Sequence, residues 1–242
     1  MMKKRAAIAF LCLLFAAPLR AGIMAAATRV IYPQDHREVS LMLANTNSYP
    51  VIVQSWVDNG EGDPESNLAP FVVLPAVFRL SPGERQGLRI IYNQDTLPSD
   101  RESVFWLNLY EIPPVTDKQS QQSRLTLAMN TQLKLFWRPK SITATLKDVV
   151  NQLTFRLVQD NSGWAIAVNN PTPLNISFTS IALVNDTVEQ SALSQMDMMT
   201  RAFSEKRYPL EAANATLKEG KIRYRYLNED GASIEKTVPL DR

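Results

Sequence analysis

Short runs in which apolar and polar residues alternate recur along most of this chain, about every ten positions from residue 23 onward. Successive side chains of a β-strand point to opposite faces, so this period of two is typical of strands with one buried and one solvated face. Asn, Asp, Gly, Pro and Ser gather between the runs, as expected of turns. The pattern predicts an all-β protein built from β-sandwiches. Clear examples are Val39 to Leu43, Leu88 to Tyr92 and Phe105 to Leu109.

The same pattern starts again after Arg138 and Pro139 and fills the second half of the chain. The new runs are LTFRLV, WAIAV, ISFTSIAL, KIRYRYL and SIEKTV. Two sandwiches of about 100 residues each would account for this length. We predict one domain over residues 22–140 and another over residues 144–242. Residues 187–200 alone have helix-like spacing, and because this stretch is short and rich in Met, a helix there is the less favoured interpretation.

The first 21 residues have the layout of a secretory signal peptide. Lys3, Lys4 and Arg5 precede an apolar run that is too short to span a bilayer, and small residues follow it. We place the cleavage site after Ala21, with a cut after Ala27 as the alternative. Since no second long apolar segment follows, we expect no membrane insertion.

Removal of this segment would change both the charge and the cysteine content. The whole chain has 26 Lys and Arg against 24 Asp and Glu, and cleavage leaves 22 basic residues and a net charge of about −2. That balance gives no sequence-level reason to expect nucleic acid as a partner. Cys12, the single cysteine, would also be removed, so hydrophobic cores rather than disulfides must stabilise the domains.

Residues that could support catalysis or metal binding are scarce. The one histidine, His36, lies in a predicted turn, and no Gly-x-Ser-x-Gly motif accompanies it. The stretch DNGEGDPES lacks the ligand spacing of an EF-hand, which favours a solvated acidic turn over a calcium loop. The stretch SPGERQG precedes a predicted strand rather than a helix, so it is not a phosphate-binding loop. We therefore expect no enzyme, no metal site and no cofactor.

One alternating run, RLTLAMNTQLKLFWRP at residues 124–139, is longer than an ordinary strand. Apolar residues occupy its odd positions from Leu125 to Trp137, with Thr131 as the exception. As one strand it would extend about 50 Å, whereas strands commonly have about five or six residues. A sandwich need shelter only its second half, which leaves the first half without an obvious function. The alternative is that all seven odd positions belong to the protein's own core.

Seven segments carry a shared signature, in order along almost the whole chain. They are GIMAAATRVIYP, PVIVQSWVD, RLSPGERQGLRI, DRESVFWLNLYEIPP, QLKLFWRP, NNPTPLNISF and YRYLNEDG. Together they resemble the periplasmic chaperones of the chaperone-usher pathway, which assemble pili (fimbriae). The resemblance implies two immunoglobulin-like domains arranged at an angle, in an L or boomerang shape, in a periplasmic protein without a cofactor. One local departure is MMTRAFSEK, where the family often has Pro before the Phe-Ser pair.

Chaperones of this family bind pilus subunits by adding one of their own strands to an unfinished sandwich. The resemblance implies that Leu125, Leu127 and Met129 fill the subunit's groove. It also implies that Arg29 and Lys134 bind the subunit's C-terminal carboxylate, as paired cations can. The alternative for each cation is a solvated strand residue.

The family also has a charge network between its domains, which the resemblance transfers to Glu102, Arg138 and Glu229. The family usually has Asp where Glu229 stands, and Asp230 lies next to it, so the geometry of this position stays open. Separate surface ion pairs are the alternative interpretation.

A last set of residues, Pro50, Ile52 and Val77, matches an apolar patch that the family presents to its outer-membrane usher. Ordinary edge-strand residues are the alternative. The polar connector VTDKQSQQS is fairly short, which favours the family's short-loop subclass.

We therefore predict a chaperone that caps pilus subunits and delivers them to an outer-membrane usher. An adhesin or a carbohydrate-binding module built from two sandwiches is the alternative. Exposed aromatic clusters on loops would favour such a module, whereas Trp56, Trp106 and Trp137 fall inside predicted strands.

Overall fold

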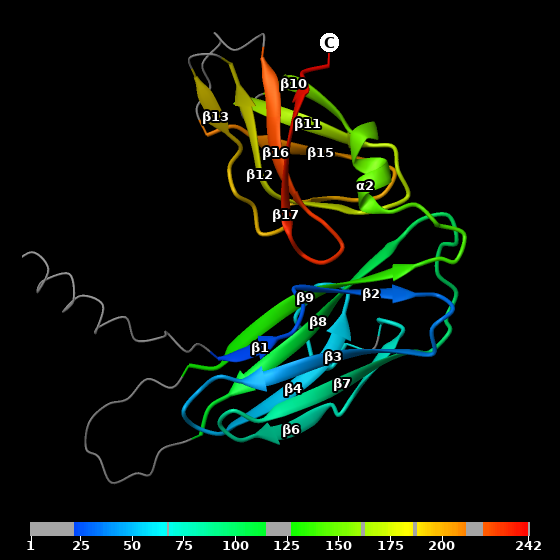
Figure 1. Ribbon diagram of the computed structural model, residues 1–242, viewed down its shortest axis with the longest axis vertical. Helices are drawn as coiled ribbons and strands as arrows, with labels where there is room; N and C mark the ends of the chain where they lie inside the picture. The colour runs from blue at the N-terminus through cyan, green and yellow to red at the C-terminus, as the bar shows by residue number, and fades with distance from the viewer. Residues whose placement is uncertain are drawn as a thin grey trace, which may run out of the picture.

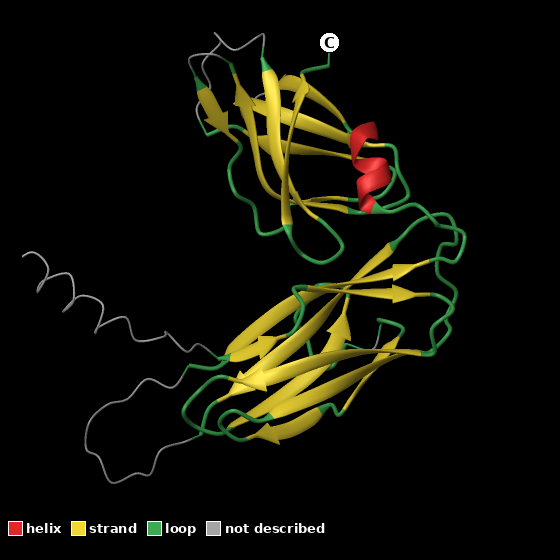
Figure 2. Cartoon of the chain, viewed as in Figure 1, coloured by secondary structure: helices red, strands yellow, loops and turns green. Residues whose placement is uncertain are grey.

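The computed structural model describes residues 22–66, 68–114, 127–160, 163–185, 188–211 and 220–241. It consists of two β-sandwiches that meet at an angle and are joined along one side (Figure 1). Strands dominate both domains, with one short helical segment at the start of the second (Figure 2). The predicted fold class, two immunoglobulin-like sandwiches at an angle, is confirmed.

The first domain packs a four-stranded sheet on a five-stranded sheet. The four-stranded sheet has the order β1 (Ile23–Ala25), β3 (Glu38–Asn45), β7 (Arg85–Tyr92) and β5 (Phe71–Leu74). The five-stranded sheet has the order β2 (Arg29–Pro33), β9 (Met129–Arg138), β8 (Ser103–Ile112), β4 (Val51–Asp58) and β6 (Val77–Leu80). All of these pairs are antiparallel except β2 with β9, which is parallel.

The start of the first domain belongs to both sheets. β1 pairs with β3 in one sheet, and after residues 26–28 the chain crosses to pair as β2 with β9 in the other. The crossing ties the two layers together at one edge, because a single stretch of chain contributes to both.

Alternation along β9 separates its two faces as the sequence predicts. Leu133, Leu135 and Trp137 are buried in the first domain's core, against residues such as Tyr32 and Phe105. Each fully buried side chain of this kind contributes about 1.5 to 3 kcal/mol. The residues between them lie on the outer face of the five-stranded sheet.

The second domain has its own core between two sheets. One sheet has the order β10 (Thr154–Asp160), β11 (Gly163–Asn170) and β15 (Ser204–Pro209). The other has the order β13 (Glu189–Ser191), β12 (Ile176–Val184), β16 (Lys221–Leu227) and β17 (Ser233–Pro239), with β14 (Met199–Thr200) also paired to β12. Phe155 and Tyr224 are fully buried between the sheets and stack with ring centroids 4.9 Å apart.

One short element differs from simple expectation. A one-turn helix, α2 (Leu146–Val149), followed by the 3₁₀ turn η1 (Val150–Gln152), precedes β10 and was not predicted. The Asp148 carboxylate accepts hydrogen bonds from the N–H and hydroxyl of Thr145 at the start of this helix. The Met-rich stretch with helix-like spacing contains strands β13 and β14, in line with the favoured interpretation that it is not a helix.

The long alternating run does not form one strand throughout its described part. β9 begins at Met129, and Leu127 lies outside it. The reason is the partner: β8 ends at Ile112, and the pair Glu111 with Met129 is the last in the ladder. Among the described residues no strand lies beside Leu127 and Ala128, so their backbone groups have no ladder to join.

Candidate functional site

The outer face of the five-stranded sheet meets the second domain, and the two predicted carboxylate ligands lie there together. Arg29 on β2 and Lys134 on β9 are direct partners in the parallel register. Both alternate with core residues, so they share the sheet face that is turned away from the core. The structure thus brings together two cations that lie 105 positions apart in the sequence.

Arg29 is a buried cation that has no acidic partner among the described residues. It is 7% exposed, its guanidinium lies 5.7 Å from the centroid of the Phe136 ring, and its Nε makes no hydrogen bond among the described residues. Burial lowers the pKa of Arg29, and the more distant charge of Glu102 opposes that effect only in part. A desolvated, unpaired cation is costly in a folded protein, which marks this position as a site for an anion.

Lys134 has a partner, and that partner comes from the other domain. Its Nζ lies 2.7 Å from Oδ1 of Asp197, and the Lys134 side chain is 21% exposed. Within the described residues, the two cations at this site are therefore in different electrostatic states, because Lys134 has an acidic partner and Arg29 has none.

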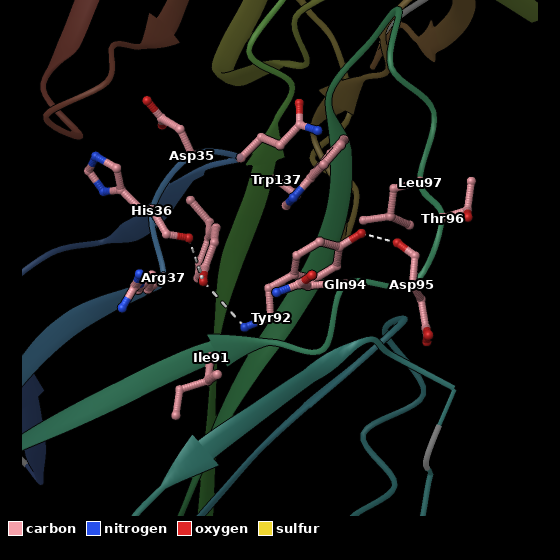
Figure 3. Close-up of a pocket in the computed structure, with 12 residues that line it drawn as sticks. Asp35, His36, Arg37, Ile91, Tyr92, Gln94, Asp95, Thr96, Leu97 and Trp137 are labelled. Atoms are coloured by element: carbon pink, nitrogen blue, oxygen red, sulfur yellow. Dashed lines mark hydrogen bonds between the residues drawn. The ribbon is translucent and has the colours of Figure 1, made fainter.

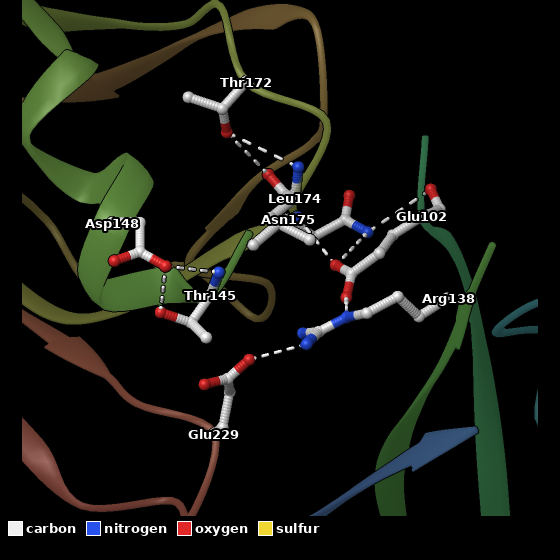
Figure 4. A network of polar contacts seen from close by, with 8 residues as sticks. All are labelled: Glu102, Arg138, Thr145, Asp148, Thr172, Leu174, Asn175 and Glu229. Carbon is white, nitrogen blue, oxygen red and sulfur yellow. Dashed lines mark hydrogen bonds and ion pairs between the residues drawn. The ribbon is translucent and has the colours of Figure 1, made fainter. Parts of the chain in front are cut away.

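The three residues predicted for an interdomain network lie in contact (Figure 4). Arg138 Nε donates to Glu102 Oε1 at 2.9 Å, and Arg138 Nη1 donates to Glu229 Oε1 at 2.6 Å. Glu102 Oε2 accepts a further bond from the Asn175 N–H at 2.9 Å. Because Glu102 and Arg138 belong to the first domain, and Asn175 and Glu229 to the second, these bonds connect the domains.

Burial dominates the electrostatics of this network. Desolvation raises the pKa of the Glu102 carboxyl, and the charge of Arg138 and the hydrogen bonds from Asn175 counteract it. A buried carboxylate that lost Arg138 would be left without charge compensation, which typically destabilises a protein by about 3 to 5 kcal/mol.

A close backbone approach reinforces the junction beside this network. Gly231, in the turn between β16 and β17, has φ +82°, and a Cβ at that position would lie 2.2 Å from Thr28 Oγ1. Thr28 lies in the first domain, immediately before β2. Glycine is therefore required here both for the backbone conformation and for contact between the domains.

The predicted groove-filling residues extend beyond the domain core. Leu127 is 71% exposed and Met129 is 50% exposed, whereas Leu125 lies outside the described residues. β2 pairs only with Lys134–Arg138, so residues 129–133 of β9 have β8 on one side and, among the described residues, no strand on the other. An open strand edge with exposed apolar side chains can accept another chain.

The predicted usher-facing residues form a small exposed group on the edge of the same sheet. Ile52 on β4 and Val77 on β6 are exposed, and Pro50, just before β4, is half-buried. Ile112 lies opposite Ile52 on the next strand and is also exposed. The residues do lie near one another, on the part of the sheet farthest from β2.

A separate surface pocket lies near the start of β3 and the end of β7 (Figure 3). Tyr32, Tyr92 and Trp137 form its inner wall, and the exposed His36 lies at its rim. None of the predicted site residues lines this pocket.

Among the described residues, no group of three or more His, Cys, Asp or Glu side chains is placed to hold a metal ion.

Sequence reasoning missed Asp197. It is the only charged residue between Gln190 and Thr200 in an otherwise uncharged, Met-rich stretch. A lone acid of this kind is a weak signal, and its partner Lys134 is 63 positions away.

In the part of the chain that the structure describes, no helix has the length and apolar character needed to span a membrane.

Two immunoglobulin-like domains, two cations at their junction and an open strand edge form an arrangement that can bind another chain by strand addition. Residues 22–143 match the family described as the pili and flagellar-assembly chaperone, PapD N-terminal domain, and residues 148–238 match the PapD C-terminal domain of pili assembly chaperones. The chain belongs to this family of pilus-assembly chaperones.

Relatives that match over nearly the whole chain agree. The probable fimbrial chaperone YadV of Escherichia coli K12 is 33% identical over 95% of this chain and 94% of its own. The probable fimbrial chaperone LpfB of Escherichia coli O157:H7 is 32% identical over 97% and 95%. These relatives are chaperones, not the adhesins or carbohydrate-binding modules of the alternative hypothesis.

Solved structures give the same result. The crystal structure of the YadV chaperone superposes with a TM-score of 0.77 at 30% identity, covering 91% of this chain and all of that one. A chain in the Salmonella enterica complex of the SafA pilin with the SafB chaperone superposes with a TM-score of 0.74 at 27% identity, covering 93% and 99%.

Proposed function

We propose that this protein acts in the periplasm, after removal of residues 1–21, as a chaperone that caps a pilus subunit and delivers it to an outer-membrane usher. The two functional units are residues 22–140 and 144–242. The subunit is an unfinished sandwich, and the open edge of β9 supplies the strand that it lacks. No cofactor is required, because strand addition forms only noncovalent contacts.

The observation that carries this proposal is the desolvated Arg29, which lies next to an open strand edge and has no acidic partner in the described part of the chain. Burying this cation destabilises the free protein, and an anion from a partner would compensate its charge when the partner binds. The terminal carboxylate of a subunit fits the requirement, since an Arg can bind a carboxylate through two parallel hydrogen bonds while Lys134 adds a compact charge.

A fixed carboxylate position has a second consequence, which concerns register. A shift of one residue along β9 would turn every apolar side chain of the added strand away from the groove. A terminus held at Arg29 and Lys134 prevents that shift. Leu125, Leu127 and Met129 then fill the groove, each contributing up to about 1.5 to 3 kcal/mol before ordering costs.

The remaining predicted residues have supporting roles in this proposal. Glu102, Arg138 and Glu229 hold the two domains at a fixed angle, so that the cleft between them is formed before the subunit arrives. Pro50, Ile52 and Val77 lie away from the cleft and stay accessible to the usher while a subunit is bound.

The test is retention of pilus subunits by tagged protein purified from periplasm, with wild type compared with Lys134→Ala. We expect the variant to fold but to retain about ten-fold to one-hundred-fold less subunit, because it loses a charge-assisted hydrogen bond worth about 1.5 to 3 kcal/mol. Lys140→Ala is the matched control, since Lys140 is exposed and lies just beyond β9. Undiminished retention by Lys134→Ala would contradict the carboxylate assignment, and no retention by wild type would contradict the proposed function.

A further inference from the structure

Asp197 lies at the end of the second domain that faces the first. It belongs to the segment between β13 and β14. β13 pairs with Ala182–Val184 of β12, whereas β14 pairs with Ile176 and Ser177 at the opposite end of that strand. The segment therefore runs along the domain toward the junction, as Figure 1 also shows. Its carboxylate reaches across to Lys134 on β9.

The backbone at Asp197 is held in place from two sides. Lys206 Nζ donates a hydrogen bond to the carbonyl oxygen of Asp197, and the Phe178 N–H donates to the carbonyl oxygen of Met198 at 2.6 Å. Both donors lie on strands of the second domain, β15 and β12. Since its backbone is fixed, the Asp197 side chain stays within reach of Lys134 as long as the domains keep their angle.

The charges of Asp197, Lys134 and Arg201 all act on Lys206, which lies beside Asp197. Burial lowers the pKa of Lys206, the charge of Asp197 opposes that shift, and Lys134 and Arg201 lower the pKa further by repulsion. The negative charge of Asp197 thus offsets part of the repulsion that Lys206 experiences in the free protein. Removing that charge, or drawing Lys134 toward another anion, changes the electrostatics of the whole group.

We propose that Asp197 is an internal occupant of the carboxylate site, which in the free chaperone pairs with Lys134 where a subunit's terminal carboxylate binds. This inference rests on the proposed function, because it takes Lys134 as a ligand of that carboxylate. A binding subunit competes with Asp197 for Lys134. Arg29 has no carboxylate partner among the described residues, so the subunit can bind it without displacing one.

The competition affects both capture and release. Part of the attraction between Lys134 and the subunit replaces an existing ion pair, so the net gain from the terminal carboxylate is smaller than it would be for a free lysine. When the subunit leaves, Asp197 returns to Lys134, and the cation is not left unpaired in a partly buried position. Asp197 is therefore a residue that limits affinity for the terminal carboxylate.

The experiment measures binding of a synthetic peptide with alternating apolar and polar residues, matched to the ten residues of β9. It is prepared with a free C-terminal carboxylate and, separately, with a C-terminal amide. Dissociation constants for both forms are measured with the two-domain protein as wild type, Asp197→Asn, Lys134→Ala and the double variant. Asp230→Asn is the matched control, because it removes the same charge from an exposed turn at the same end of the second domain.

We expect Asp197→Asn to bind the carboxylate peptide about five-fold to ten-fold more tightly than wild type, with the amide peptide changed by less than about two-fold. The gain should disappear in the Lys134→Ala background, since there is then no cation to compete for. Asp230→Asn should leave both dissociation constants at the wild-type values.

Three results would overturn the inference, and they separate it from the proposed function. If wild type prefers the carboxylate peptide but Asp197→Asn does not improve its binding, only the inference fails. If both peptides improve equally, or the gain persists without Lys134, Asp197 acts through something other than this cation and the inference again fails alone. If wild type binds neither peptide, or does not distinguish them, the proposed carboxylate site fails and the inference with it.

Discussion

Arg29 and Lys134 occupy directly opposed positions on the parallel strands β2 and β9, yet only Lys134 has a carboxylate partner in the described residues. The asymmetry is unexpected for two side chains on the same face of one sheet. It arises because Asp197 of the second domain reaches Lys134, whereas Arg29 lies against the Phe136 ring. Stability and function should therefore respond differently to changes at the two positions.

Arg29→Met should separate stability from binding. We expect the free energy of unfolding to rise by about 1 kcal/mol, because the change removes a buried cation that has no acidic partner. Subunit retention should be lost, since the carboxylate loses its bidentate ligand. Urea unfolding and periplasmic pull-down measure the two effects, with the exposed Arg37→Met as control. Lower stability combined with normal retention would contradict this view of Arg29.

Leu127→Asp should affect binding without affecting folding. The side chain is exposed in the free protein, so we expect the free energy of unfolding to change by less than about 0.5 kcal/mol. Subunit capture should fail, because a carboxylate would enter the apolar groove. Leu133→Asp, in the buried half of the same alternating run, is the contrasting variant and should prevent stable folding. Similar folding defects in both variants would show that Leu127 belongs to the protein's own core.

Gly231→Ala should disturb the junction between the domains. A Cβ there would lie 2.2 Å from Thr28 Oγ1, in addition to the strain of a positive φ. Gly83→Ala is a matched control, since Gly83 has φ +75° and nothing within 4 Å of its Cβ position. We expect Gly83→Ala to cost about 1 kcal/mol and Gly231→Ala about 1 to 3 kcal/mol more, by urea unfolding.

Small-angle scattering should also show the domains displaced in Gly231→Ala. Adding Thr28→Ala should restore much of the loss, because it removes the oxygen that the new Cβ meets. Equal costs for Gly231→Ala and Gly83→Ala would mean that the close approach to Thr28 is unimportant.

Tyr224→Phe should change how stability depends on alkaline pH. Burial raises the pKa of Tyr224 from its usual 10 to about 12. As pH rises, the unfolded chain therefore loses the Tyr224 proton before the folded protein does. Between pH 10 and 12 the folded state holds more protons than the unfolded state, so the free energy of unfolding falls as pH rises. For one group the decrease is at most about 1.4 kcal/mol per pH unit. The Phe variant should lose stability less steeply there. Between pH 7 and 9 the two proteins should keep a constant difference, and parallel curves up to pH 12 would contradict the assignment.

Sequence periodicity was sufficient to predict the sandwiches and the inward face of β9. Leu133, Leu135 and Trp137 are buried because strand geometry alternates side chains regardless of tertiary context. Periodicity does not reveal what covers the opposite face. Arg29 could therefore be read as a solvated strand residue, whereas it is buried at a junction that forms only when the second domain is in place.

Other features depend on distant partners or on very short elements. The start of β9 at Met129 follows from where β8 ends, which no pattern within the run itself encodes. Helix α2 has four residues, too few to show a helical period. The contact between Lys134 and Asp197 depends on the angle between the domains, so neither residue's local sequence predicts it.

The parallel pairing of β2 with β9 also sets a direction. β2 starts at Arg29, and the open part of β9, residues 129–133, ends just before Lys134, the position opposite Arg29. A strand that ended with its carboxylate at Arg29 and followed this open part would run in the same direction as β9. It would lie head to tail with β2, and the two segments would form one interrupted edge strand with slanted, evenly spaced hydrogen bonds. β2 would thus set the direction in which the added strand runs.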